Sequence, residues 1–288
     1  MNLGRRATSG PFSFGAAEAK QALAEIITID DPDDPRVSVY RQVRERDLVG
    51  RQGGFIAEGE VVLRVLLTGG GPHRAASLLL DGKRLARLEP LTAHLPDETP
   101  IYVAGQAVLD AIAGFHLHRG ILAHGRTAAD PGAAALLADL GESALVLALH
   151  GIANHDNMGG LFRNAAAFGM DAVLLDATSC DPLYRKAIRV SVGAALKVPF
   201  ARMAPDEDLL AVLEAAGFSV LALSPGGAEP LAGLKRPPRA ALLLGAEGPG
   251  LPPAMLARTR TFSIAMAPGW DSLNVASAAA VALHELRR

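Results

Sequence analysis

From residue 145 onward, short apolar segments alternate with segments of helical pattern. We expect strands at 145–149, 172–175, 198–201, 220–223, 241–244 and 261–264, and helices at 159–168, 182–190, 206–216, 252–257 and 274–286. Strands that are apolar at nearly every position are buried on both faces, and strands that alternate with helices pair in parallel. This part of the chain therefore predicts an α/β fold, in which a parallel sheet is covered by helices on both faces.

The residues before 127 indicate a second, smaller α/β domain. We expect helices at 55–67 and 106–112 and strands at 77–80 and 101–103. The aspartate- and proline-rich segment 30–35 precedes this domain, because its prolines cannot continue a helix or a central strand. The expected organisation is an N-terminal tail at 1–35, the small α/β domain at 36–126, an alanine-rich linker at 127–143 and the larger domain at 144–288.

Composition restricts the compartment and the kind of partner. The 288 residues carry a net charge of −2, so a nucleic-acid partner would require basic residues gathered on one face. Five arginines between residues 36 and 51 fit either an ordinary solvated helix face or a phosphate-contacting one: Arg36, Arg41, Arg44, Arg46 and Arg51.

The single cysteine, Cys180, excludes an intrachain disulfide and a multi-cysteine zinc site, which favours a reducing cytoplasm. No run approaches the roughly 18 apolar residues of a membrane span, and the first residues lack the apolar core of a signal peptide.

Three polar segments follow expected strands, at the carboxyl ends where parallel sheets bind ligands. The first is residues 154–164, in which Asn157 is expected at the entrance of a helix and Arg163 about a turn and a half inside it. An arginine on a helix often faces solvent, but the neighbours of Arg163 are mostly apolar. Its permanently charged guanidinium suits a phosphate, a carboxylate or a developing oxyanion.

The second segment, residues 244–251, places glycines directly after an apolar strand. Glycines permit positive φ angles and a close approach of the backbone to a ligand. The segment lacks the Gly-Lys-Ser/Thr ending of a phosphate loop, and Glu247 would repel phosphate. It therefore favours a cationic or hydroxyl-bearing ligand, with an ordinary glycine-rich turn as the alternative.

The third segment, residues 264–274, ends in Ser272, Leu273 and Asn274 and leads into a helix of small residues at 276–280. Asn274 fits a helix cap, since its side chain can accept the unpaired N–H groups of the first turn. The small residues after it permit tight packing. Trp270, the single tryptophan, could stack on a base or fill a gap.

Taken in order, these segments resemble the three motifs of the SpoU class of RNA ribose methyltransferases, the TrmH-like branch of the SPOUT superfamily. The resemblance covers residues 145–286, and segments 55–59 and 118–123 resemble the RNA-binding domain often fused ahead of it. The cluster of Arg189, Ser191, Gly193 and Ala194 is also similar to these proteins, whereas Ala265 stands where the family usually has proline. By this resemblance the catalytic positions are Asn157, Arg163, Glu247, Ser272 and Asn274. The positions for S-adenosylmethionine are Leu244, Gly245, Gly248, Ile264, Met266 and Leu273.

The resemblance implies an enzyme that methylates a ribose 2'-hydroxyl in tRNA or rRNA, with S-adenosylmethionine as methyl donor and no metal. It also implies a trefoil knot, a cytoplasmic homodimer, and neither DNA nor a membrane as partner. Pattern alone would predict an ordinary doubly wound sheet, because threaded chains are nearly absent from proteins. Two alternatives are a noncatalytic RNA-binding protein that retains the fold, and a small-molecule nucleotide-dependent enzyme with a conventional sheet.

Overall fold

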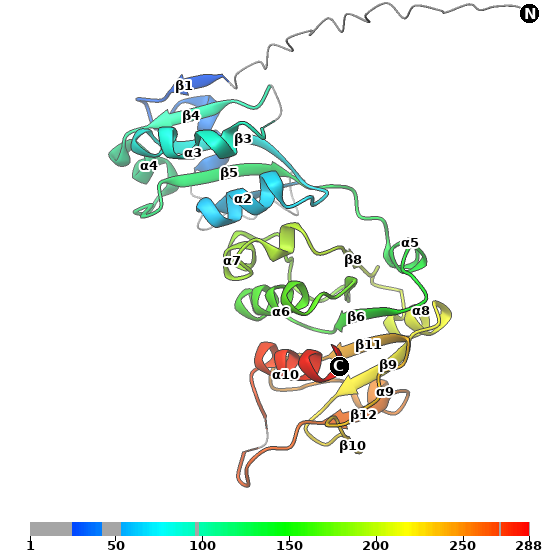
Figure 1. Cartoon of the computed structure of the whole chain (residues 1–288). Coiled ribbons are helices and arrows are strands. Elements are labelled where there is room, and N and C mark those ends of the chain that lie inside the picture. Colours follow the sequence, from blue (N-terminus) through cyan, green and yellow to red (C-terminus); the bar gives the residue numbers. More distant parts are fainter. Residues whose placement is uncertain (1–24, 42–52, 96–97, 271, 288) are drawn as a thin grey trace, which may run out of the picture.

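A parallel sheet forms the core of the C-terminal lobe, residues 144–287 (Figure 1). The computed structural model describes residues 25–41, 53–95, 98–270 and 272–287, and within them this sheet has seven strands in the order β10-β12-β9-β11-β6-β7-β8. The strands are β6 (Ala144–Leu149), β7 (Ala172–Leu175), β8 (Phe200–Arg202), β9 (Ser219–Leu223), β10 (Glu229–Pro230), β11 (Arg239–Leu244) and β12 (Arg260–Ser263). The helices are α6 (His155–Phe168), α7 (Arg185–Val190), α8 (Leu209–Ala215), α9 (Pro253–Leu256) and α10 (Val275–Arg287). The expected parallel α/β architecture is confirmed.

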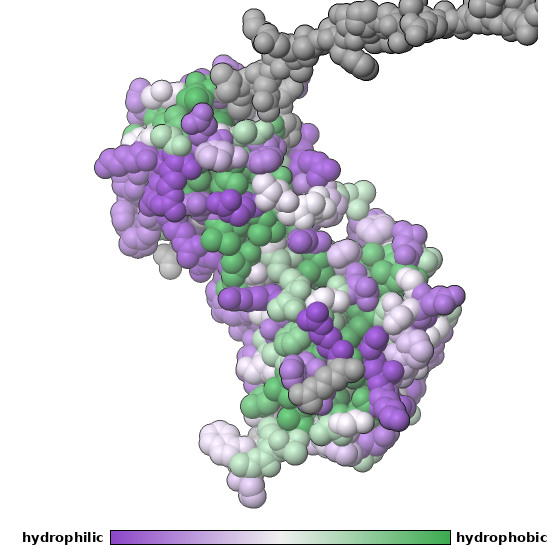
Figure 2. All heavy atoms as spheres, in the orientation of Figure 1, coloured by the Kyte–Doolittle hydropathy of each residue, from purple (hydrophilic) through white to green (hydrophobic). Residues whose placement is uncertain are grey.

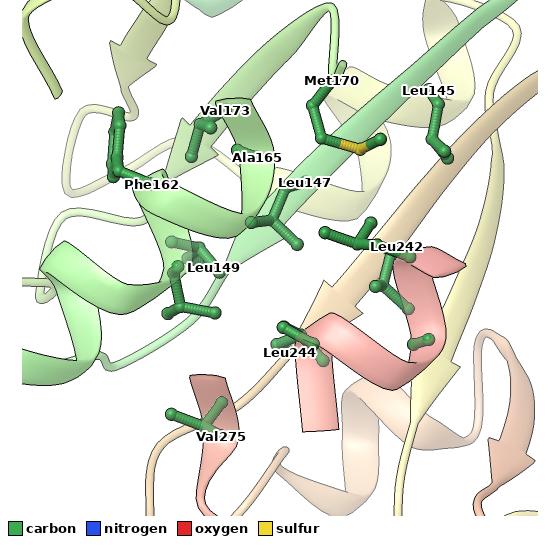
Figure 3. Packing of buried hydrophobic residues seen from close by; sticks show 14 of the residues in the cluster. Leu145, Leu147, Leu149, Phe162, Ala165, Met170, Val173, Leu242, Leu244 and Val275 are labelled. Carbon is green, nitrogen blue, oxygen red and sulfur yellow. The ribbon is translucent and has the colours of Figure 1, made fainter. Parts of the chain in front are cut away.

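Alternate residues of each central strand serve opposite faces of this sheet. Leu145, Leu147 and Leu149 of β6 pack in the layer that contains α6 and α10 (Figure 3). Val146 and Ala148, between them, pack in the layer that contains α8 and α5 (Ala133–Ala138). Because both layers are apolar, β6 is apolar at every position, as the sequence pattern indicates.

The N-terminal lobe, residues 25–126, contains a mixed sheet with five strands in the described part of the chain, ordered β1-β4-β3-β5-β2. These are β1 (Ile26–Thr28), β2 (Gly54–Glu58), β3 (Arg74–Asp81), β4 (Ile101–Ala104) and β5 (Ile121–Arg126). Its helices are α2 (Glu60–Thr68), α3 (Leu85–Thr92) and α4 (Gln106–Ala113), with short 3-10 helices at Pro35–Tyr40 and Gly82–Arg84.

The two lobes share an apolar cluster. Leu183, Ile188 and Leu196 of the C-terminal lobe pack with Phe55 and Leu66 of the N-terminal lobe. The backbones of the two lobes also approach each other closely. A Cβ atom on Gly71 would lie 2.1 Å from the carbonyl oxygen of Leu196. The lobes are therefore held together by buried contacts in addition to the connecting chain.

One predicted element in the first half of the chain was wrong, and two segments contain structure that the sequence analysis did not expect. Residues 55–58 form strand β2 rather than the start of a helix, because they pair with β5 and the positive φ angle of Gly59 (92°) separates them from α2. The expected tail contains β1, which pairs with β4 at the sheet edge. The expected linker contains α5, whose Leu137 is buried in the sheet layer beside α8.

The arginine cluster is only partly described. Arg36 binds Asp34 (2.6 Å) and Arg41 lies 3.4 Å from Asp33, so aspartates of the preceding segment neutralise these two. Arg44, Arg46 and Arg51 lie outside the described residues.

Within the described ranges, no helix combines the length and apolarity needed to cross a lipid bilayer. The trefoil knot stays a prediction.

Candidate active site

A cavity of about 720 Å³ opens at the carboxyl ends of β9, β11 and β12, beside the start of α10. All six positions expected to hold the cofactor line it: Leu244, Gly245, Gly248, Ile264, Met266 and Leu273. Three of the five expected catalytic residues line it as well: Glu247, Ser272 and Asn274. The second and third polar segments of the sequence therefore form one site.

Glycines shape the loop that follows β11. A Cβ atom on Gly245 would lie 2.5 Å from the carbonyl carbon of Gly250, so a larger residue could not fit where the loop folds back. Gly248 and Gly250 adopt positive φ angles of 85° and 68°, and the Gly250 N–H donates to the carbonyl oxygen of Ala246 (3.0 Å). This geometry presents Glu247 at the exposed end of the loop, where it contributes a carboxylate to the cavity wall.

Asn274, in the third polar segment, is hydrogen-bonded to residues of the other two. Its Nδ2 donates to Oδ1 of Asn157 (2.8 Å) and to Oε1 of Glu247 (2.5 Å). Its Oδ1 accepts the backbone N–H groups of Ala276 (3.0 Å) and Ser277 (3.3 Å), as expected of a helix cap. The cap identifies which amide atom is oxygen, and all donors and acceptors of this amide are then engaged.

Asn157 reaches the site from α6. The side chain of Asn154 caps this helix by accepting the Asp156 N–H (2.7 Å), so α6 begins at His155 and Asn157 lies within its first turn rather than at its entrance. Asn157 is 6% exposed and does not line the cavity. Its link to the site is the hydrogen bond from Asn274.

Arg163 is not brought to the cavity within this chain. It lies on α6, its side chain is exposed, and it forms no hydrogen bond or ion pair with any residue that the structure describes. The neighbouring Asn164 instead packs inward and donates to the carbonyl oxygen of Ala276 (2.6 Å). The guanidinium of Arg163 is thus available to a group that approaches from outside.

Helices α6 and α10 pack closely because their contact residues are small. A Cβ atom on Gly160 would lie 2.8 Å from the Cβ of Ala276, and Ala279 is fully buried. The small-residue segment of α10 therefore packs against α6, which brings Asn157 and Asn274 together. Ala278, one turn along α10, lines the cavity.

Trp270 projects from the loop between β12 and α10, which extends from the surface in Figures 1 and 2. The backbone N–H of Trp270 donates to the carbonyl oxygen of Ala267 (3.3 Å). Pro268 and Gly269 (φ 88°) form the centre of this turn. The residue is 77% exposed. In this chain Trp270 does not fill a gap.

One part of the wall was missed by the sequence analysis. Ser224, Pro225 and Gly226 follow β9, the strand next to β11, and also line the cavity. The signal was present, because a Ser-Pro-Gly-Gly turn follows an apolar strand at this point. Among the described residues, no group of three or more His, Cys, Asp or Glu side chains could hold a metal ion.

The fold and the cavity together define an α/β protein whose candidate ligand site lies at the carboxyl ends of parallel strands. Residues 144–284 match the SpoU rRNA methylase family. An uncharacterised tRNA/rRNA methyltransferase of Mycobacterium tuberculosis is 40% identical over 279 residues, which is 92% of this chain and 92% of that protein. The 23S rRNA (guanosine-2'-O-)-methyltransferase RlmB of Salmonella typhi is 30% identical over 219 residues, 74% of this chain and 89% of that protein.

A solved structure has the same fold. The AdoMet-bound rRNA methyltransferase from Sinorhizobium meliloti superposes with a TM-score of 0.77 at 22% identity, over 91% of this chain and 98% of that one. The chain belongs to the SpoU family of RNA methyltransferases.

Proposed function

We propose that this protein transfers the methyl group of S-adenosylmethionine to the 2'-hydroxyl of a ribose in a tRNA or an rRNA. The observation that carries the proposal is the amide of Asn274, which lines the cavity and binds both Glu247 and Asn157. All three polar segments of the sequence contribute to this arrangement. The names of the relatives, a tRNA/rRNA methyltransferase and a 23S rRNA 2'-O-methyltransferase, support the choice of RNA and of the ribose.

The cavity has the features that S-adenosylmethionine requires. Its volume of about 720 Å³ lies within the range of small-molecule sites. Leu244, Ile264 and Leu273 offer apolar walls, and the bare backbone at Gly245 allows close approach. Glu247 suits a ligand with a positive charge. S-adenosylmethionine would supply an activated methyl group on its sulfonium, and these residues would hold it.

The residues of the chain would act mainly by positioning. Methyl transfer to an oxygen needs in-line approach of two bound reactants, so orientation accounts for much of the rate. Because every donor and acceptor of its amide is engaged, Asn274 orients Glu247 and Asn157 rather than touching the ribose itself. Glu247 keeps Oε2 for the ligand, and Ser272 lies exposed at the cavity wall.

We assign to Arg163 the stabilisation of the negative charge that develops on the ribose 2'-oxygen. A guanidinium that has no partner among the residues described can stabilise that charge by a charge-assisted hydrogen bond. The proton of the 2'-hydroxyl would pass to an RNA phosphate or to water. His155 is a weaker candidate for the base, since its ring stacks on Tyr184 at a centroid distance of 4.2 Å.

We also propose a cytoplasmic homodimer. Leu273 and Val281, before and within α10, are 46% and 43% exposed and give the helix an apolar outer surface that a second copy could cover. Arg163, which lies outside the cavity wall of its own chain, is on the adjoining helix α6. The single cysteine is compatible with a reducing compartment.

Two measurements test the proposed function. Calorimetric titration of the full chain should show binding of S-adenosylmethionine, and mapping of 2'-O-methylated nucleotides in a deletion strain should reveal a position that the parent strain methylates. Failure to bind S-adenosylmethionine would contradict the proposal. Binding of RNA without methyl transfer would favour the noncatalytic alternative.

A further inference from the structure

A second cavity, of about 430 Å³, lies in the N-terminal lobe next to the junction with the C-terminal lobe. Leu66, Leu67 and Leu95 contribute apolar walls to it. The polar side chains that line it are those of His73, Arg74 and His94, and no aspartate or glutamate that the structure describes does so. The cavity therefore combines an apolar interior with cationic or hydrogen-bond-donating groups.

His73 is held in a fixed orientation. Its side chain is buried, its Nδ1 accepts the backbone N–H of Ala128 (3.1 Å), and its ring contacts Phe55 edge-on at a centroid distance of 5.5 Å. Because Nδ1 accepts, a neutral ring must carry its hydrogen on Nε2. Burial, together with the charge of Arg74, lowers the pKa of His73 and so favours the neutral ring.

The Nε2–H group of His73 has no partner in the described part of the chain. Within the described part of the chain, the one sealed side-chain nitrogen or oxygen without a hydrogen-bond partner is Nε of Arg41. Nε2 of His73 has no partner among the described residues and is not sealed in this way, so it is accessible from outside the protein core, and His73 lines the cavity. A largely buried donor of this kind is best satisfied by an acceptor on a ligand.

Two basic residues, Arg74 and Lys197, belong to the lining of the cavity and to the segment beside Gly71, respectively. One guanidinium nitrogen of Arg74 donates to the carbonyl oxygens of Gly71 and His73 (2.9 Å each), and its other donors have no partner among the described residues. A Cβ atom on Gly71 would lie 3.4 Å from the Cα of Lys197, so the C-terminal lobe reaches this edge. Lys197 is exposed and makes no ion pair with any residue in the described ranges.

We infer that this cavity receives one unstacked nucleotide of the RNA substrate. The base lies among the three leucines and accepts a hydrogen bond from Nε2 of His73, while its phosphates lie near Arg74 and Lys197. Single-stranded RNA is read by splayed-out bases in apolar sites, and its phosphates are bound by Lys and Arg. A nucleotide held at the lobe junction would set the register of the RNA relative to the main cavity. The inference rests on the proposed function for the identity of the ligand as RNA.

The test uses the full chain and a single-stranded RNA of mixed sequence, about ten nucleotides long, which is within the usual site size. NMR of ¹⁵N-histidine-labelled protein should show a shift of the Nε2 signal of His73 on addition of this RNA. His73→Phe, which keeps an aromatic ring but removes both ring nitrogens, should weaken binding about fivefold, as loss of one hydrogen bond to the RNA implies. His73→Gln, which keeps an N–H donor, should recover most of that loss.

A charge variant supplies a second measurement that does not disturb the core. Lys197→Gln should weaken binding and reduce the slope of log affinity against log salt by about one phosphate contact. Lys235→Gln, which removes an exposed lysine at a distance from this cavity in the sequence and in the fold, is the matched control. Equal effects of the two lysine variants would contradict the inference.

The inference and the proposed function fail in different ways. His73→Phe should bind S-adenosylmethionine with the affinity of the parent and, with RNA as substrate, should raise KM about fivefold at unchanged kcat. A parental KM together with an unmoved His73 signal would overturn the nucleotide site while leaving the methyltransferase intact. If the parent chain fails to bind S-adenosylmethionine but RNA still shifts His73, the proposed function fails and the nucleotide site stands.

Discussion

Arg185 Nη1 lies 2.5 Å from Oε2 of Glu58, and this ion pair joins the two lobes. The side chains are 13% and 9% exposed, and the Arg185 guanidinium also lies over the ring of Phe115 at 5.1 Å. Arg189 approaches the same carboxylate at 3.8 Å. The segment around Glu58 and the cluster that begins at Arg189 both resemble the family in sequence, and the structure shows that they meet.

Glu58→Gln should lower the free energy of unfolding by about 3 kcal/mol, because removal of one partner leaves a buried charge uncompensated. The matched control is Glu229→Gln, which breaks a pair with Arg260 whose side chains are 49% and 51% exposed. That change should cost less than about 1 kcal/mol. Chemical denaturation measures both, and equal losses would show that the lobe junction does not depend on the ion pair.

Arg163→Ala should reduce kcat for RNA methylation by about 100-fold or more, as expected when an oxyanion-stabilising donor is lost. Folding and binding of S-adenosylmethionine should stay near parental values, because the side chain is exposed and does not line the cavity. Single-turnover kinetics and calorimetry provide the readouts. Full activity in this variant would remove Arg163 from the mechanism.

Asn274 allows its two roles to be separated. Asn274→Ala should destabilise the protein by about 1 kcal/mol through loss of the helix cap, and should also reduce activity. Asn274→Ser should restore the stability, since serine is a good cap, but not the activity, since it cannot donate to both Asn157 and Glu247. Thermal unfolding and methylation assays compare them, and recovery of activity in the serine variant would assign Asn274 to capping alone.

Ala278→Phe should abolish binding of S-adenosylmethionine by filling the cavity that Ala278 lines. Ala111→Phe, at an exposed position of α4 in the other lobe, is the control for adding a phenyl ring. Calorimetric titration should detect binding in the control alone. Parental affinity in Ala278→Phe would mean that α10 provides helix packing there and no ligand contact.

Asp176 gives the stability a pH dependence. Burial raises the pKa of its carboxyl, but hydrogen bonds from Ser179, Thr178 and the Gly151 N–H outweigh burial and leave the pKa below 3.8. The carboxylate therefore stabilises the folded state above about pH 3.8, and this contribution is lost as pH falls through the lowered pKa. Asp176→Asn should be less stable than the parent at about pH 6, with a difference that shrinks toward pH 3. A difference independent of pH would contradict this.

Local pattern predicted the C-terminal lobe well and the N-terminal lobe less well. Strands β6 and β7 are apolar throughout, and β9 and β11 are apolar after their first residue, because both faces of the sheet are covered. That pattern is visible without a structure. Residues 55–58 were misassigned because an apolar segment next to a helix continues the helical pattern, and only pairing with β5 makes it a strand. Strand β1 was missed because three residues at a sheet edge carry too little pattern.

By itself the sequence determined the alternation of strands and helices, the glycines that the β11 loop requires, and the three segments that resemble the SpoU family. Only the tertiary structure decided how these segments meet. The hydrogen bond between Asn157 and Asn274 spans 117 positions of the chain, and it depends on the order of the strands and on the close contact of α6 with α10. Periodicity reports which face of an element is buried, but it does not report which element covers that face. For the same reason the lobe junction and the cavity around His73 could be seen only in the folded chain.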